Sequence, residues 1–175
     1  EQAFKSAAEQ FWPPDPSELT ASLGGIVSAN GRGPGAFKYG SAAAHVESLR
    51  LLTADGNVCK GGPGEALCEA ACGGEGMFVA ITALTLRLRP KPAAMWGICF
   101  FFNSENAGAS FVDKAKALAP SALAALDFLD RAAMDMVGGL KAVAAKLREL
   151  PDTPPEAEAA AYIELHAATE DELEE

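Results

Sequence analysis

Basic residues are few in this chain: 14 Lys and Arg stand against 24 Asp and Glu, which gives the 175 residues a net charge of −10. Without a basic stripe that could neutralise phosphates, nucleic acid is not expected as a partner. No apolar run approaches the roughly 20 residues that span a bilayer, and residues 1–10 lack the charged-then-apolar order of a signal peptide. We therefore expect a soluble, cytoplasmic protein with no membrane span.

Paired cysteine motifs are also missing. The four cysteines, Cys59, Cys68, Cys72 and Cys99, include no CxxC pair. Cys68 and Cys72 are four residues apart in an Ala-rich stretch, so they would lie on one helix face but supply only two ligands. Buried free thiols are favoured over a metal or iron-sulfur site, and no metal-binding residue is predicted.

Proline and glycine are concentrated in two places. The prolines of residues 11–16 exclude a regular helix and predict an extended loop. Residues 22–40 hold six glycines, too many for a helix or an ordinary strand, so we expect backbone there that can approach a flat or phosphorylated ligand. The spacing is not a Rossmann fingerprint, because it does not follow a strand and open a helix.

The remaining pattern predicts an α+β fold. We expect strands over residues 45–53, 78–88, 96–102, 122–130 and 159–167, a short strand after the Asp55-Gly56 turn, and helices over residues 65–72, 104–118 and 131–150 and from residue 169. Alternating prolines make residues 89–92 the best domain boundary. The alternation of strand and helix after it is typical of part of a ferredoxin-like layer.

Four segments, taken in order, resemble one family. They are residues 13–16 (PPDP), 22–40 (SLGGIVSANGRGPGAFKYG), 49–58 (LRLLTADGNV) and 73–90 (GGEGMFVAITALTLRLRP). This order is similar to the second part of the flavin domain in FAD-linked oxidases of the vanillyl-alcohol-oxidase type, particularly the D-lactate dehydrogenase and glycolate oxidase branch. Residues 123–137 resemble the stretch of that family's cap domain that follows its first strand and helix. The stretch 56–67 is shorter than in the family and lacks its Gly-Tyr-Asp element.

The resemblance implies a partial flavin-binding subdomain in residues 1–92, followed by a partial ferredoxin-like cap domain in residues 93–175. It also implies FAD as the cofactor, hydride transfer to the flavin from a small-molecule 2-hydroxy acid such as D-lactate or glycolate, and an iron-sulfur electron acceptor as a candidate partner. Carried over by position, the family's flavin contacts fall on Pro14, Asp15, Ser22, Gly24, Gly25, Ala29, Asn30, Gly31, Tyr39, Gly40, Glu75, Gly76, Val79 and Ile81.

In the family, a glycine-rich loop upstream of this region holds the flavin pyrophosphate, and the substrate-binding and metal-binding histidines come later in the cap. We therefore expect a fragment without catalytic residues that alone neither holds FAD firmly nor turns over a hydroxy acid. His45 and His166 match no catalytic position of the family and are expected to be structural. If the flavin reading holds, residues 24–31 and 75–81 should lie side by side along one groove.

Two other functions stay open. The chain could be a non-catalytic α+β binding module in which the glycines serve only tight turns. It could also resemble an alkyl-glycerone-phosphate-synthase-like transferase, which uses the same flavin domain for a different reaction.

Overall fold

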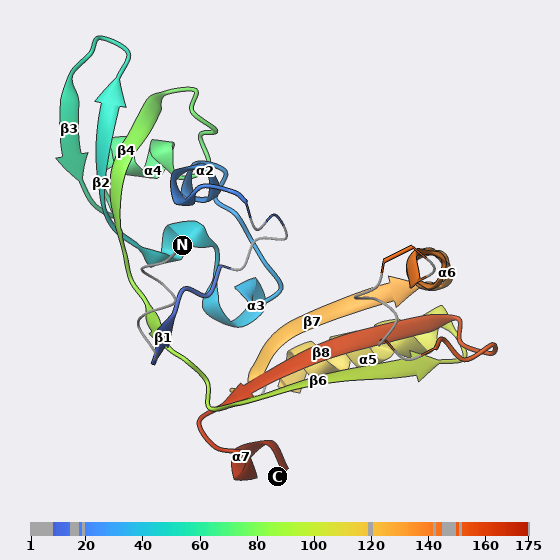
Figure 1. The fold of residues 1–175 in the computed structure, drawn as a ribbon. Coiled ribbons are helices and arrows are strands. Elements are labelled where there is room, and N and C mark those ends of the chain that lie inside the picture. Colours follow the sequence, from blue (N-terminus) through green and yellow to red (C-terminus); the bar gives the residue numbers. More distant parts are fainter. Residues whose placement is uncertain are drawn as a thin grey trace. The chain divides into compact units, whose positions relative to one another are not determined.

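Each half of the chain builds its own three-stranded antiparallel sheet (Figure 1). The computed structural model describes residues 9–14, 18, 20–118, 121–141, 143–144, 150 and 152–174. The chain divides into two units, Glu1–Lys91 and Pro92–Glu175. Helices with antiparallel sheets confirm the α+β class; the identity of each unit stays a prediction.

The first unit is organised around its central strand. Its sheet has the order β3 (Val58–Gly61), β2 (Val46–Thr53) and β4 (Val79–Leu86), and β1 (Gln10–Phe11) pairs separately with β5 (Arg89–Pro90). The helical segments are α2 (Leu23–Ser28), α3 (Ala36–Tyr39), the 3-10 helix η1 (Ala42–His45) and α4 (Ala66–Ala71).

Burial in the first unit follows the pattern of the central strand. Leu49 and Leu51 of β2 are buried and belong to one core with Val27 of α2 and Cys68 of α4. Side chains two apart point to the same face of a strand, so this alternation turns one face of the sheet toward the helices. The Asp55-Gly56 turn forms as predicted, because Gly56 takes a φ of 83° that suits glycine.

Two expectations for the first unit were wrong. The glycine-rich residues 22–40 contain two short helices, because Ser22 caps α2 and burial of Ile26 and Val27 outweighs the low helix propensity of glycine. His45 ends a 3-10 helix instead of starting a strand. Arg89–Pro90 of the predicted extended connector pairs as β5 with β1, and the chain divides directly after it, at Lys91.

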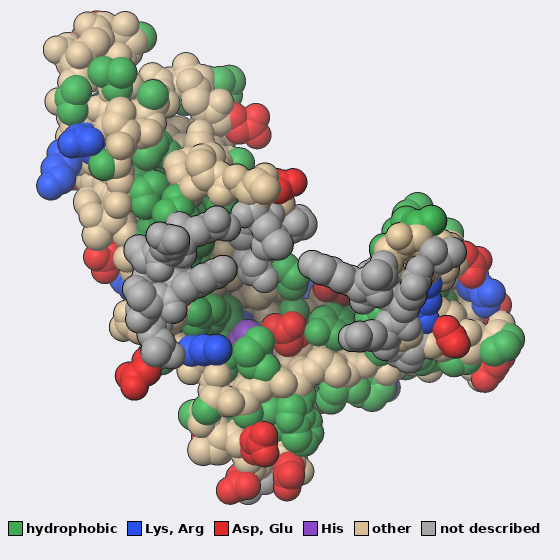
Figure 2. All heavy atoms as spheres, viewed as in Figure 1, with side chains coloured by type: hydrophobic (Ala, Val, Ile, Leu, Met, Phe, Trp, Pro, Cys, Tyr) green, Lys and Arg blue, Asp and Glu red, His purple; other side chains and the backbone are tan. Residues whose placement is uncertain are grey.

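The second unit is a split β-α-β arrangement. Its sheet has the order β6 (Ala94–Phe102), β8 (Ala159–Ala167) and β7 (Leu123–Asp130), with α5 (Glu105–Leu118), α6 (Arg131–Lys141) and α7 (Asp171–Glu174). Both outer strands run antiparallel to β8, so β6 and β7 are parallel and α5 joins them with β8 inserted between. The acidic side chains of α7 gather on an exposed end of the unit (Figure 2).

Helix α5 covers one face of this sheet. The Phe111 ring lies 4.9 Å from the Phe100 ring and 5.3 Å from the Phe102 ring, between centroids. Gly108 lets the helix approach, since a Cβ there would lie 2.9 Å from the Phe128 ring. The helix predicted over residues 131–150 was too long. It ends at Lys141, soon after the two adjacent glycines of α6, and Val143 and Ala144 are not helical.

Within the part of the chain that the structure describes, no helix has both the length and the apolar character that crossing a membrane requires.

The buried His45 predicts a pH dependence of stability. Its side chain is 1% exposed, and its Nε2 donates to the Tyr39 carbonyl oxygen at 2.9 Å. Burial, helped by the charges of Arg89 and Arg87, lowers the His45 pKa although the hydrogen bond opposes this. The unfolded chain therefore binds the proton more readily, so stability is fully present above about pH 6.5 and falls as the pH drops toward the lowered pKa.

Urea unfolding at about pH 7.5 and about pH 5.5 checks this, with His45→Gln as the variant that cannot titrate. We expect the free energy of unfolding to drop more between the two pH values in the natural chain than in the variant. Equal drops would show that His45 does not set this dependence.

Candidate functional site

The two glycine-rich segments of the first unit are held together by one backbone carbonyl. The Ser28 oxygen, at the end of α2, accepts hydrogen bonds from the N–H of Gly73 at 2.9 Å and of Glu75 at 3.0 Å. At the other end of α2, the Cβ position of Gly24 lies 4.0 Å from the Ile81 carbonyl oxygen of β4. The predicted side-by-side arrangement of residues 24–31 and 75–81 is thus confirmed.

Helix α2 forms despite two consecutive glycines, each of which costs about 1 kcal/mol relative to Ala in a helix interior. The Ser22 hydroxyl oxygen accepts from the Gly25 N–H at 3.1 Å and so caps the first turn. Ile26 and Val27 then bury their side chains in the core. The helix is therefore stabilised by its cap and its packing.

Gly24 is the glycine of α2 that this packing does not require. A Cβ added there would meet no described atom closer than the Ile81 carbonyl oxygen, at 4.0 Å. Its φ is not in the left-handed region, so the backbone does not demand glycine either. Neither the backbone conformation nor the described neighbours therefore require glycine at position 24.

The residues after α2 have local reasons for their identity. Asn30 takes a left-handed φ of 47°, and its Oδ1 accepts from the Ala43 N–H at 3.0 Å. Gly31 donates to the Ile26 carbonyl at 2.8 Å, and a Cβ on Gly31 would lie 2.9 Å from the Ile26 Cγ2. Asn30 and Gly31 thus close the helix by their backbone conformation, and Ala29 is its exposed C-cap.

The second glycine-rich turn, residues 73–76, also depends on its backbone. Gly73 and Gly76 have φ values of 94° and 83°, and Glu75 has a left-handed φ of 50°. A Cβ on Gly74 would overlap the Ala70 carbonyl oxygen at the end of α4. The turn leads into β4, where Val79 points into the core and Ile81 is half-buried, so the predicted contact at Val79 would have to use its backbone.

Tyr39 and Gly40 lie beside the N-terminal loop. The Tyr39 ring stands edge-on to the Phe11 ring, with centroids 5.5 Å apart, and the Lys38 amino group lies 5.6 Å from the Tyr39 ring centroid. Gly40 has a φ of 83°, which favours glycine. Pro14 is buried, whereas Asp15 lies outside the described residues.

Metal-ligating side chains do not cluster: the described residues contain no group of three or more His, Cys, Asp and Glu arranged to hold a metal ion. The four cysteines are free, but only Cys68 is buried, so the expectation of buried thiols was wrong for half-buried Cys59 and Cys72 and for exposed Cys99. Desolvation raises the thiol pKa of Cys68, Cys72 and Cys99. These thiols are therefore protonated at neutral pH and are poor metal ligands or nucleophiles.

Sequence reasoning missed Ser28, which joins the two segments. Because its carbonyl makes both bonds, any residue could supply them, and no side-chain signal could have identified the position.

Gly74 gives a test of this geometry. Gly74→Ala should lower the free energy of unfolding by about 3 kcal/mol, since the new Cβ would force the turn away from α4. Glu75→Gly, at the next position, should change it by less than about 0.5 kcal/mol, because relief of the left-handed strain offsets the greater entropy of glycine in the unfolded chain. Chemical denaturation of both variants measures this, and equal losses would contradict the described turn.

Comparison with known proteins gives a family. A model described as FAD binding domain matches residues 2–62, which include the first glycine-rich segment but not the turn at residues 73–76. The D-lactate dehydrogenase of Archaeoglobus fulgidus is 32% identical over 133 residues, covering 71% of this chain and 29% of that protein. The glycolate oxidase subunit GlcD of Escherichia coli K12 is 33% identical over 137 residues, covering 73% and 28%.

A more distant relative is the D-2-hydroxyglutarate–pyruvate transhydrogenase DLD3 of Saccharomyces cerevisiae, which is 26% identical over 151 residues, 82% of this chain and 29% of that protein. The chain thus spans less than a third of the length of these relatives. FAD is the cofactor that the family match and the relatives support.

Proposed function

We propose that this chain is part of an FAD-linked oxidase, whose relatives it matches along part of their length, and that it serves an FAD-dependent oxidoreductase that oxidises a 2-hydroxy acid such as D-lactate or glycolate. The names of the relatives support this substrate class. We assign no catalytic residue to the chain: its contribution is to bind and orient. When bound, the flavin supplies the acceptor of the substrate hydride.

Residues 1–92 are proposed as the second part of the FAD-binding domain, and residues 93–175 as the first part of a ferredoxin-like cap. The division of the structure between Lys91 and Pro92 supports this boundary. The strand order β6, β8, β7 supports the cap, since a strand inserted between two parallel neighbours is the arrangement of ferredoxin-like folds.

The open space at Gly24 is the observation that carries the proposal. Described neighbours account for glycine at Gly31, where the Ile26 side chain excludes a Cβ, and at Gly74, where the Ala70 carbonyl oxygen does, but not at Gly24. Glycine has a low helix propensity, so its presence in a helix indicates a role other than helix stability. A glycine without a side chain allows a ligand to approach the backbone closely. Gly24 lies beside β4, and α2 and β4 together carry four of the proposed flavin contacts, Gly24, Gly25, Val79 and Ile81.

In this proposal, the exposed backbone of Gly25 and Ala29 lies along the cofactor with Gly24. Across from them, Glu75 and Gly76 present an exposed turn that the Ser28 carbonyl holds in place. The remaining proposed contacts are Pro14, Asp15, Ser22, Asn30, Gly31, Tyr39, Gly40, Val79 and Ile81.

We also propose a cytoplasmic location and an iron-sulfur protein as electron acceptor. The four free cysteines support the location, because unpaired thiols persist in reducing compartments.

The absorption spectrum of the full-length natural protein tests the function. We expect a bound flavin spectrum that bleaches when D-lactate or glycolate is added without an electron acceptor, since the flavin then keeps the electrons. A spectrum without flavin would favour a non-catalytic binding module. Bound flavin that no 2-hydroxy acid bleaches would overturn the substrate class but not the cofactor.

Substitution of Gly24 separates folding from cofactor binding. Gly24→Ala should raise the free energy of unfolding by about 0.5 kcal/mol, because Ala has the higher helix propensity and space is available. Gly24→Leu should fill the space and weaken FAD binding by the full-length protein about tenfold or more, a loss of about 1.4 kcal/mol.

FAD affinity is measured by fluorescence titration of the apoprotein, and stability by denaturation. Gly138→Ala in α6 is the matched control, since it also replaces a helical glycine that has no close neighbour. The Gly138→Ala variant should raise the free energy of unfolding and leave FAD affinity unchanged. If Leu at position 24 also left it unchanged, the proposed contact at Gly24 would be wrong.

A further inference from the structure

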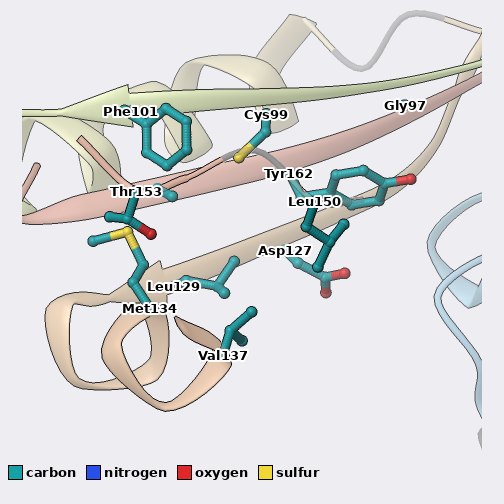
Figure 3. A pocket seen from close by; sticks show the side chains of 11 residues that line it. Gly97, Cys99, Phe101, Asp127, Leu129, Met134, Val137, Leu150, Thr153 and Tyr162 are labelled. Atoms are coloured by element: carbon teal, nitrogen blue, oxygen red, sulfur yellow. The ribbon is translucent and has the colours of Figure 1, made fainter. Parts of the chain in front are cut away.

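The second unit contains a cavity on the sheet face opposite α5 (Figure 3). Its volume is about 610 Å³, within the range of small-molecule sites. Most of its wall is apolar: Phe101, Leu129 and Ala160 come from the three strands, and Met134 and Val137 come from α6. Gly97, Asp127 and Tyr162 complete it toward the other end (Figure 3).

A row of polar side chains begins where the apolar wall ends. Tyr162, Glu164 and His166 alternate along β8 and therefore point to the same face of the sheet. The Tyr162 hydroxyl donates to one Glu164 oxygen at 3.2 Å, and His166 Nε2 lies 2.6 Å from the other. Asp127 of β7 is paired in register with Tyr162 and lies on the same side.

Gly97 makes this arrangement possible. A Cβ on Gly97 of β6 would lie 2.7 Å from the Tyr162 hydroxyl oxygen, so any other residue would displace the ring. Glycine in the middle of a strand weakens it and often marks a place of close approach. The Tyr162 hydroxyl is thereby held over β6 at the edge of the cavity.

The polar edge offers acceptors to a ligand. The Tyr162 proton is directed to Glu164, and the pKa of Tyr162 is raised by burial and by the nearby Glu164, so the hydroxyl keeps that proton. Its oxygen can then accept from a ligand, as can the Asp127 carboxylate. Among the described residues that line the cavity there is no Lys or Arg.

The two basic side chains of α6 are directed elsewhere. Lys141 binds the Leu150 carbonyl and the Asp152 carboxylate, and Arg131 binds Asp135 and the carbonyls of Pro155 and Ala157. Neither is among the lining residues. Among the described residues, an anionic head group would therefore meet Asp127 without a compensating cation.

We propose that this cavity binds a small molecule with an apolar body and a neutral or cationic head group that donates hydrogen bonds, an alcohol or an amine, and discriminates against a carboxylate. The apolar wall holds the body, and Asp127 with Tyr162 accepts from the head group. The site is carried by residues of the second unit alone, and it does not depend on the proposed flavin reaction.

Three probes with one apolar body test the head-group preference: 4-phenylbutan-1-ol, 4-phenylbutylamine and 4-phenylbutanoate. Each is titrated into the isotope-labelled 175-residue chain and followed by NMR, with the Met134 methyl as the reporter from the cavity wall. We expect the alcohol and the amine to shift this resonance saturably, and the carboxylate to bind about tenfold or more weakly. No shift with alcohol and amine, or equal binding of all three, overturns the proposal.

Variants separate the head group from the body. Asp127→Asn should weaken amine binding and strengthen carboxylate binding. The matched control Asp113→Asn, at an exposed position of α5, should change neither. Val137→Phe should fill the cavity from the partly exposed side of α6 and abolish binding of the alcohol and the amine. The amide spectrum of each variant verifies folding. An Asp127→Asn variant with unchanged selectivity would refute the role given to this carboxylate.

Discussion

The candidate site of the first unit depends on one acceptor, the Ser28 carbonyl. Its two hydrogen bonds fix the turn at residues 73–76 against the end of α2. The turn also needs Gly74 to pack against the end of α4, and α4 in turn contributes Cys68 and Ala71 to the core. Helix α2, helix α4 and the beginning of β4 are therefore one interlocked structure, and a shift in any of them would move the other two.

The glycines of this structure have two different kinds of cause. At Gly40, Gly73 and Gly76 the backbone has a positive φ, and at Gly31 and Gly74 a neighbouring atom excludes a Cβ. Folding alone explains these five. Gly24 has neither cause, and it lies on the side of α2 that faces β4. Gly35 also has a negative φ and no atom that excludes a Cβ, so the role proposed for Gly24 rests in addition on its place beside β4.

The sequence predicted those elements in which local pattern and burial agree. Strand β8 has the predicted bounds, and α5 begins one residue later than predicted, because long runs of regular periodicity dominate their own conformation. Helix α2 was missed because its stability comes from the Ser22 cap and from burial of Val27, and tertiary packing overrides propensity. For the candidate site, the resemblance supplied the positions, and the adjacency of the two glycine-rich segments was predicted. The means of joining them was not, since a backbone carbonyl leaves no trace in the sequence.

In the second unit, successive side chains of each strand point to opposite faces of the sheet, and the two faces differ in character. On one face, Phe100 and Phe102 pack against Phe111 of α5, and on the other, Phe101 and Leu129 line the cavity. Because β8 is central, its alternate side chains must follow the same division, which places Tyr162, Glu164 and His166 in one row beside the cavity. The edge of the cavity is therefore acidic, as is the chain as a whole. Among the described residues, the polar edge of the cavity carries carboxylates and no lysine or arginine, and the selectivity proposed for the cavity rests on this imbalance of charge.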